Sequence, residues 1–139
     1  MGASFEMITP EQLSNPEVED AEQAALFCWC AINRDKYPML KWLHAIPNNN
    51  KHRQVATGVR GGVPDIFLPW PIKFKFCMVT QYHGLYIEMK IEKRRNHKNG
   101  GCSDEQVDWI EYLLSVGYQC HVCYGWQEAR DRILEYLNG

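Results

Sequence analysis

Two segments organise this sequence: Gly58-Val-Arg-Gly-Gly-Val-Pro-Asp65 and Gly84-Leu-Tyr-Ile-Glu-Met-Lys90. Asp65 precedes a short apolar run, and Glu88 and Lys90 end a second one. Because strand side chains alternate between faces, Glu88 and Lys90 should point the same way. Two carboxylates and a lysine at adjacent strand ends are costly to bury without a partner. A divalent cation such as Mg²⁺ prefers oxygen ligands and would offset this cost, with the lysine beside the water that the metal activates.

The two segments resemble the halves of the PD-(D/E)XK nuclease motif, which fall here on Pro64-Asp65 and Glu88-Met89-Lys90. Within that superfamily the sequence is similar to the VRR-NUC family, through Gly58-Val59, Gly62-Val63, residues 84–90 and Gln106. The resemblance covers roughly residues 18–137. A Glu-x-Lys tripeptide alone occurs by chance in most proteins. Its order and spacing relative to Gly-x-Pro-Asp and the later Ser-x-x-Gln make the combination specific.

The resemblance implies a restriction-endonuclease-like α/β fold: a mixed sheet flanked by helices, in the order helix, three strands, helix, strand, helix. With 139 residues the chain has the length of a single domain, in which residues 1–14 would be a lead-in segment. The implied activity is that of a Mg²⁺- or Mn²⁺-dependent DNA endonuclease, selective for branched, flapped or Holliday-junction DNA and acting as a homodimer. The alternative is a catalytically weak nucleic-acid-binding module of the same fold.

The resemblance also implies roles for the motif residues. Asp65 and Glu88 would bind the metal, and the backbone carbonyl of Met89 would add an oxygen ligand. Lys90 would orient or deprotonate the attacking water and stabilise charge on the phosphate. Decay to a binding module would normally remove Asp65, Glu88 or Lys90, and all three are present.

Two further site residues come from predicted helices. Glu19, Glu22 and Gln23 share one helical face, which by itself is typical of a solvated acidic surface. In the resembling family a first-helix glutamate four residues before a glutamine helps to hold the metal, which maps to Glu19 and Gln23, with Glu22 as the fallback. Ser103 and Gln106 fit a capping box at a helix start. By resemblance, Gln106 would also reach the active-site lysine or the substrate.

The composition is that of an ordinary soluble protein, with 45% hydrophobic residues, 23% charged residues and a net charge of −2. No apolar run approaches the roughly 20 residues that span a bilayer, and no secretory signal is present, so we expect a cytoplasmic location. The six cysteines should therefore stay reduced. The pairs Cys28-x-Cys30 and Cys120-x-x-Cys123 do not point together in a helix or a strand, which disfavours a zinc site.

Basic residues gather in two places despite the acidic net charge. One group follows the Glu-x-Lys segment, and the other lies before Asp65. A basic loop is most often simply solvated, but beside a metal-binding carboxylate pair it favours contacts with DNA phosphates. The residues predicted to contact DNA are Arg60, Lys93, Arg94, Arg95, Lys98, Lys51 and Arg53.

In the first half of the chain, Asn15 and Pro16 predict the start of a helix that runs to about Arg34. Its expected apolar stripe is Val18, Ala21, Ala25, Cys28 and Ile32. A helical turn is expected over residues 10–13, a strand over residues 40–46 and a short helix over residues 54–58. After a strand over residues 66–68, the alternation of Phe74, Phe76 and Met78 predicts a half-exposed strand, in a hairpin between the two motif halves.

In the second half, a strand over residues 85–91 is followed by a loop over residues 96–101 without apolar anchors. A helix then runs from Ser103 to a stop at Gly117, followed by a strand over residues 118–124 and a helix over residues 127–137. The middle helix should bury Trp109, Ile110, Leu113 and Leu114, and the last helix Ile133, Leu134 and Leu137. Trp70, Trp126 and residues 74–78 could supply a dimer interface.

Overall fold

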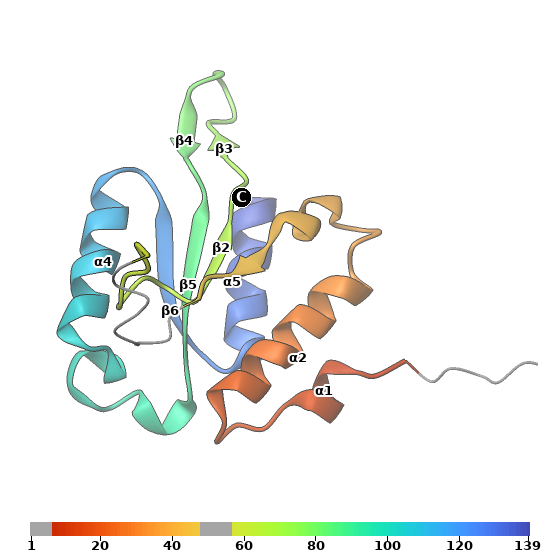
Figure 1. Ribbon diagram of the computed structural model, residues 1–139. Helices are drawn as coiled ribbons and strands as arrows, with labels where there is room; N and C mark the ends of the chain where they lie inside the picture. Colours follow the sequence, from red (N-terminus) through yellow and green to blue (C-terminus); the bar gives the residue numbers. More distant parts are fainter. Residues whose placement is uncertain (1–6, 48–56) are drawn as a thin grey trace, which may run out of the picture.

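A four-stranded mixed sheet forms the centre of the computed structural model, which describes residues 7–47 and 57–139. Its strand order is β1 (His44–Ala45), β2 (Ile66–Leu68), β5 (Leu85–Lys90) and β6 (Gln119–Tyr124). The first three strands pair antiparallel, whereas β5 and β6 are parallel. A parallel pair needs a crossover, and α4 (Asp104–Ser115) provides it (Figure 1). The predicted mixed α/β fold is therefore confirmed.

Helices cover both faces of this sheet. α2 (Glu19–Ile32) and α5 (Trp126–Asn138) lie on one side of the strands and α4 on the other (Figure 1). The side chains at Ile87 and Met89 are fully buried in the core that α2 and α5 close. The alternate positions of β5 point to the α4 side, and they are Tyr86, Glu88 and Lys90. The two faces of one strand thus separate the hydrophobic core from the polar motif.

The first long helix begins later than predicted and buries a different face. The side chain of Asn15 accepts a hydrogen bond from the Glu17 amide at 3.1 Å in a turn that precedes α2, so it does not cap the helix. The predicted stripe is partly wrong, because Val18 and Ile32 are 44% and 43% exposed. The residues that α2 buries are Glu22, Ala25, Leu26 and Cys30. The apolar pattern of the sequence did not predict a buried carboxylate in this face.

The connection to the sheet also differs from the prediction. Residues 40–46 were expected to form a strand, but Pro38–Trp42 is a 3₁₀-helix, η1, and only His44–Ala45 is extended. Proline fixes φ at a helical value and suits the first turn, which explains the start of η1 at Pro38. The expected helical turn over residues 10–13 is present as α1 (Pro10–Leu13). The predicted helix over residues 54–58 falls mainly outside the described residues.

A small antiparallel hairpin separates the two halves of the motif, as predicted. It consists of β3 (Ile72–Lys73) and β4 (Thr80–Tyr82) and projects beyond the main sheet (Figure 1). The predicted alternation over Phe74, Phe76 and Met78 is wrong, since these residues form its turn. The Phe76 and Met78 side chains are 98% and 79% exposed.

The later helices begin and end close to their predicted limits. Gly117, with φ of +96°, ends the turn after α4, and α4 itself buries only Leu113. The predicted burial of Leu114 is wrong, since this side chain is 52% exposed. The proposal of Trp126 as an interface residue is also wrong, because its side chain is only 2% exposed. All six cysteines are unpaired, and no helix of the described residues is long and apolar enough to cross a membrane.

Candidate active site

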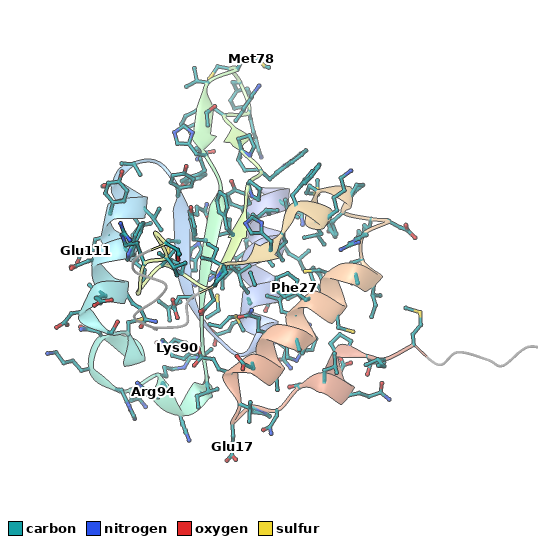
Figure 2. The ribbon with its side chains drawn as sticks, viewed as in Figure 1. Glu17, Phe27, Met78, Lys90, Arg94 and Glu111 are labelled. Atoms are coloured by element: carbon teal, nitrogen blue, oxygen red, sulfur yellow. The ribbon has the colours of Figure 1, made fainter. Side chains whose placement is uncertain are left out.

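Three carboxylates from three separate elements converge at the carboxyl end of β5. Glu19 begins α2, Asp65 directly precedes β2, and Glu88 lies within β5. One oxygen of each carboxylate lies within 4.8 Å of the other two. Lys90 and Arg94 lie at this end of the molecule, opposite Met78 in the hairpin turn (Figure 2). Within the described residues, this is the one group of three or more acidic, histidine or cysteine side chains that could hold a metal ion.

Asp65 is fixed by a backbone amide. Oδ2 of Asp65 accepts a hydrogen bond from the Met89 N–H at 2.7 Å. The antiparallel register pairs Ile66 with Ile87, and its continuation would place Pro64 opposite Met89. Proline has no N–H to donate to the Met89 carbonyl, so the ladder pair cannot be completed there. The Met89 amide donates to the Asp65 side chain instead, and this bond holds the carboxylate beside Glu88.

The carbonyl of Met89 points to the same edge. The Lys90 carbonyl accepts from the Gly125 amide at 3.1 Å, so the backbone groups of Lys90 face β6. Those of Met89, one residue earlier, face the β2 edge, as its bond to Asp65 also requires. Because the N–H and C=O of one strand residue share an edge, the Met89 carbonyl is directed toward the carboxylate group.

Glu88 is buried with only half of its carboxylate paired. Its side chain is 1% exposed, and Oε2 accepts from Gln106 Nε2 at 3.1 Å and lies 3.6 Å from Lys90 Nζ. Oε1 is buried and has no hydrogen-bond partner among the described residues. Burial, followed by the neighbouring Asp65, raises the pKa of Glu88 to about 9, while Lys90 acts in the opposite direction. A cation at Oε1 would satisfy this oxygen and favour the ionised carboxylate.

Gln106 joins the lysine to the helix that follows. Its Oε1 accepts from Lys90 Nζ at 3.2 Å and from the Ser103 amide at 2.8 Å. The Ser103 side chain in turn accepts from the Gln106 amide, so the predicted capping box is present. The two interpretations of Gln106 are therefore compatible, because one side chain caps α4 and contacts both Lys90 and Glu88.

Of the first-helix candidates, Glu19 belongs to the carboxylate group and Glu22 does not. The Glu19 carboxylate lies at the N-terminus of α2, where the helix dipole favours negative charge. Partial burial raises the pKa of Glu19, against the effect of Lys90 and with that of Asp65. Glu22 is 2% exposed and accepts from the Ser14 hydroxyl and, at 3.2 Å, from the Trp126 amide. Its carboxylate is thus occupied in joining α2 to the start of α5.

Gln23, the glutamine of the predicted pair, lies four residues after Glu19 and is half-buried. It lines a shallow hollow with Asp20, Phe27 and Ala45. Among the described residues, Gln23 forms no hydrogen bond with any of the three carboxylates, whereas Gln106 donates one to Glu88.

The basic segment after β5 is compact. It contains two 3₁₀-helices, η2 (Glu92–Arg94) and η3 (Lys98–Gly101). The loop expected over residues 96–101 contains η3 instead, and the Tyr124 hydroxyl donates to the Gly100 carbonyl at 2.6 Å. A Cβ on Gly100 would lie 2.2 Å from that hydroxyl, so glycine is needed for this contact.

The predicted DNA-contacting residues fall into three sets. Arg60, Lys93 and Lys98 have exposed side chains. The Arg94 guanidinium donates to the Gly101 carbonyl at 3.3 Å, and that of Arg95 pairs with Glu92 and Glu128 while lying over the Tyr124 ring. Lys51 and Arg53 lie outside the described residues. The structure therefore leaves Lys93 and Lys98 more available to a ligand than Arg95.

Two features of this site were not anticipated from the sequence. The amide of Met89 that holds Asp65 is a backbone group and carries no sequence signal. The second is Cys102, a residue that is 8% exposed and whose thiol pKa is raised by burial, with Lys90, Glu88 and Asp65 as charged neighbours. Its position just before the Ser103 capping residue could have indicated that it lies near Lys90.

The chain and its fold can now be compared with known proteins. The family model of the VRR-NUC domain matches residues 12–127. A solved structure titled "VRR_NUC domain protein" has 25% sequence identity to this chain and a TM-score of 0.65, over 87% of this chain and 88% of that one. No curated protein matches the chain. The match spans the first helix, Asp65, the Glu88-Met89-Lys90 segment and the Gln106 helix, and the chain therefore belongs to the VRR-NUC family, a family of nuclease-type domains.

Proposed function

We propose that this protein is a Mg²⁺- or Mn²⁺-dependent DNA endonuclease that hydrolyses phosphodiester bonds. The observation that carries the proposal is the convergence of the Glu19, Asp65 and Glu88 carboxylates, together with a buried Glu88 oxygen that has no hydrogen-bond partner among the described residues. Carboxylate and carbonyl oxygens are the ligands that hard divalent cations prefer. Asp65, Glu88 and Glu19 would hold the ion, and the Met89 carbonyl would supply a further oxygen.

The bound ion would polarise the phosphate and lower the pKa of a bound water. Lys90 provides the protein's own cation at this point. Its Nζ is held by Gln106 Oε1 and lies 3.6 Å from Glu88 Oε2, so the ammonium is fixed beside the carboxylates. From there it would orient the attacking water and stabilise charge on the phosphate, because preorganised charge needs no rearrangement as the reaction proceeds.

DNA would approach over the basic residues beside the carboxylates. Exposed cations at Arg60, Lys93 and Lys98 support this, since phosphate contacts provide affinity without reading sequence. Branched, flapped or Holliday-junction DNA as the substrate, and a homodimer as the active form, follow from the family resemblance. The exposed hairpin turn with Phe76 and Met78 supports an interface of this kind.

A catalytically weak DNA-binding module of the same fold is the alternative. One experiment separates the two: linear, flapped and four-way DNA are incubated with the protein and Mg²⁺ or Mn²⁺, with and without excess EDTA. We expect cutting that requires the metal and is lost in Asp65→Asn. Binding without cutting for every substrate and metal would favour the module, and cutting that persists in EDTA would contradict a metal-dependent mechanism.

A further inference from the structure

A second hollow lies on the same face of the sheet as the carboxylates. It has a volume of about 520 Å³ and lies between α4 and the amino end of β5. We call this hollow the aromatic pocket, and its lining residues are His83, Tyr86, Trp109, Tyr112, Leu113, Val116 and Tyr118. Five of these seven side chains carry a flat ring, and none is an acid.

The rings are held in place by one another. Tyr86 stacks on Phe67 with 4.2 Å between ring centroids, and Tyr118 meets Tyr86 edge-on at 5.3 Å. On the opposite wall, Trp109 and Tyr112 are edge-to-face at 6.4 Å. Leu113 is buried, whereas Tyr112 is 57% exposed and accessible from solvent. The pocket is therefore preformed and open, and its walls present aromatic rings from both the sheet and α4.

The position of the pocket links it to the carboxylates. Tyr86 and Glu88 are two residues apart on one face of β5, which places their Cα atoms about 7 Å apart. This distance is about two base steps along one strand of a duplex, at roughly 3.4 Å each. For a DNA strand with a phosphate at the carboxylates, this spacing corresponds to a base about two steps away near Tyr86.

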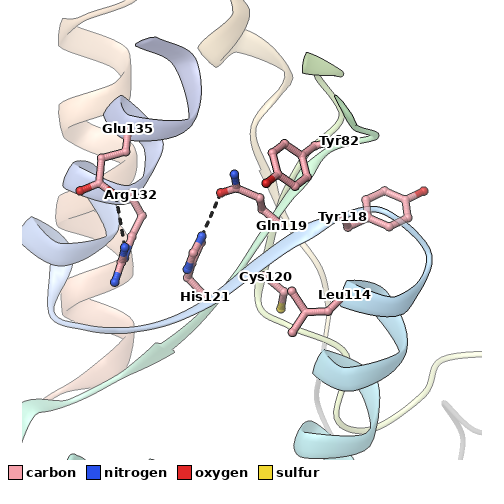
Figure 3. Close-up of a pocket in the computed structure, with 8 residues that line it drawn as sticks. All are labelled: Tyr82, Leu114, Tyr118, Gln119, Cys120, His121, Arg132 and Glu135. Atoms are coloured by element: carbon pink, nitrogen blue, oxygen red, sulfur yellow. Dashed lines mark hydrogen bonds and ion pairs between the residues drawn. The ribbon is translucent and has the colours of Figure 1, made fainter. Parts of the chain in front are cut away.

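A neighbouring hollow on the other side of Tyr118 differs in its chemistry (Figure 3). There His121 pairs with Gln119 at 2.9 Å and Arg132 with Glu135 at 3.2 Å, so these four polar side chains already have partners. It also lies along β6, an edge strand, away from Glu88. The aromatic pocket is the one whose chemistry and position both suit a nucleobase.

We propose that the aromatic pocket binds one unpaired nucleobase of the DNA strand that is cut. Every base has a π-face that can stack on an aromatic side chain, so such a contact is largely independent of sequence. A base inside a duplex must first be unstacked, whereas one at a flap or branch point is already free. The pocket would thus select DNA by structure, an inference that rests on the proposed nuclease function for the identity of the strand.

The test removes one base at a time. Duplex DNA with a single-stranded arm is prepared with an abasic site at each successive arm position near the branch, and binding is measured by fluorescence anisotropy without added divalent metal. We expect one position at which loss of the base weakens wild-type binding by about 5- to 150-fold, the range for one stacked base. Trp109→Leu should show the weakened affinity on intact DNA and little further loss on the abasic DNA.

Two further variants test whether the aromatic pocket is responsible for the effect. Tyr112→Ala removes an exposed ring and should reproduce the effect of Trp109→Leu without unfolding the protein. Trp42→Leu removes an indole that is 52% exposed on η1, outside the pocket, and should behave as wild type. Equal sensitivity of wild type and Tyr112→Ala to the abasic site, or no sensitive position at all, would overturn the proposal.

The result is separable from that of the nuclease test. If the protein cuts DNA with Mg²⁺ or Mn²⁺ but no abasic position matters, the pocket proposal is wrong and the nuclease proposal stands. If one position matters and depends on Trp109 and Tyr112, but no DNA is cut with either metal, the pocket is supported and the nuclease proposal is wrong.

Discussion

The two ends of one face of β5 contain opposite kinds of chemistry. At the carboxyl end, Glu88 and Lys90 are buried with charged and hydrogen-bonding partners; at the amino end, Tyr86 packs against other rings. The charged end depends on Gln106 and Asp65, which meet it from other elements, and on the Met89 amide of β5 itself. The aromatic end depends on rings from β2 and from the residue before β6, which are stabilised by burial and stacking geometry and need no charged partners. Added metal and changes in pH should therefore affect the carboxyl end of β5. The presence of an unpaired base in the DNA should affect the amino end.

The largest effect should come from the charged end. Lys90→Met should slow single-turnover cleavage by about 100-fold or more, as for other groups that assist proton transfer, while DNA binding is retained. Asp65→Asn keeps an acceptor for the Met89 amide but loses the charge, so it should abolish both metal binding and cutting. Calorimetric titration measures metal binding in each variant, and a single-turnover assay measures cleavage.

Tyr86→Leu is the matched variant at the aromatic end. Its metal affinity should equal that of wild type, since the Tyr86 ring faces the pocket rather than the carboxylates. A loss of metal binding in Tyr86→Leu would mean that the two ends are not independent. If Lys90→Met cuts at the wild-type rate, Lys90 has no role in the reaction.

A smaller effect is expected from the basic residues beside the charged end. Lys93→Ala combined with Lys98→Ala should reduce the slope of log affinity against log salt by about 2, or roughly 0.9 for each phosphate contact. Arg95→Ala should change the slope less, because Glu92 and Glu128 already pair with its guanidinium. Titrations of DNA binding at several salt concentrations give the slopes. An equal loss in both variants would mean that Arg95 exchanges its carboxylates for phosphates.

Gln106→Leu should reduce both stability and cutting. It removes the acceptor for Lys90 and the donor to Glu88, so we expect cutting to fall by about 10-fold, or roughly 1.4 kcal/mol. Ser103→Ala is the control, since it weakens the cap by about 0.5–2 kcal/mol but touches neither Lys90 nor Glu88. Thermal unfolding and cleavage rates distinguish the two roles. An equal loss of cutting in both variants would assign the whole effect to the helix cap.

The smallest expected effect is on stability without metal. The pKa of Glu88 is raised to about 9 in the folded protein, from about 4.5 when unfolded, so between these values the folded state binds the extra proton. This contribution to the stability of the folded protein is therefore fully present below about pH 4.5 and is lost as the pH rises toward about 9. We expect the melting temperature in EDTA to fall between about pH 5.5 and about pH 8.5, because unfolding releases a proton over this range.

Glu88→Gln should remove this pH dependence, because the amide does not titrate. Added Mg²⁺ or Mn²⁺ should reverse the loss in wild type, since a ligand of the folded state stabilises it. Scanning calorimetry of both proteins gives the comparison. Matching pH profiles for wild type and Glu88→Gln would show that Glu88 is not the group responsible.

What the sequence predicted well were the local patterns. The alternation around Glu88 and Lys90 follows from the period of a strand, and the Ser103–Gln106 cap lies within four residues. What it could not predict depends on distant partners. Glu22 appeared as part of a solvated face because its partner, the Trp126 amide, is 104 residues away. The alternation of Phe74, Phe76 and Met78 is present in the sequence, but these residues lie in a turn, and Phe76 and Met78 are largely exposed.

The candidate site was predicted in part for the same reason. Asp65, Glu88 and Lys90 could be found because their spacing follows the strands. The amide of Met89 that holds Asp65, and the rings that pair across the aromatic pocket, come together only when β2, β5 and α4 are assembled.

The hydrogen bond from the Trp126 amide to Glu22 also bears on how the protein matures during synthesis. Glu22 lies one turn after Glu19 in α2, and its anchor belongs to the last helix of the chain. A ribosome-bound chain that has emerged only as far as β6 contains every candidate catalytic residue but not this anchor. The carboxylate of Glu22 would then be left without one of its partners, and α2 would be held less firmly against the sheet. The position of Glu19 at the candidate site is thus fully supported only after α5 has been synthesised and has packed against α2.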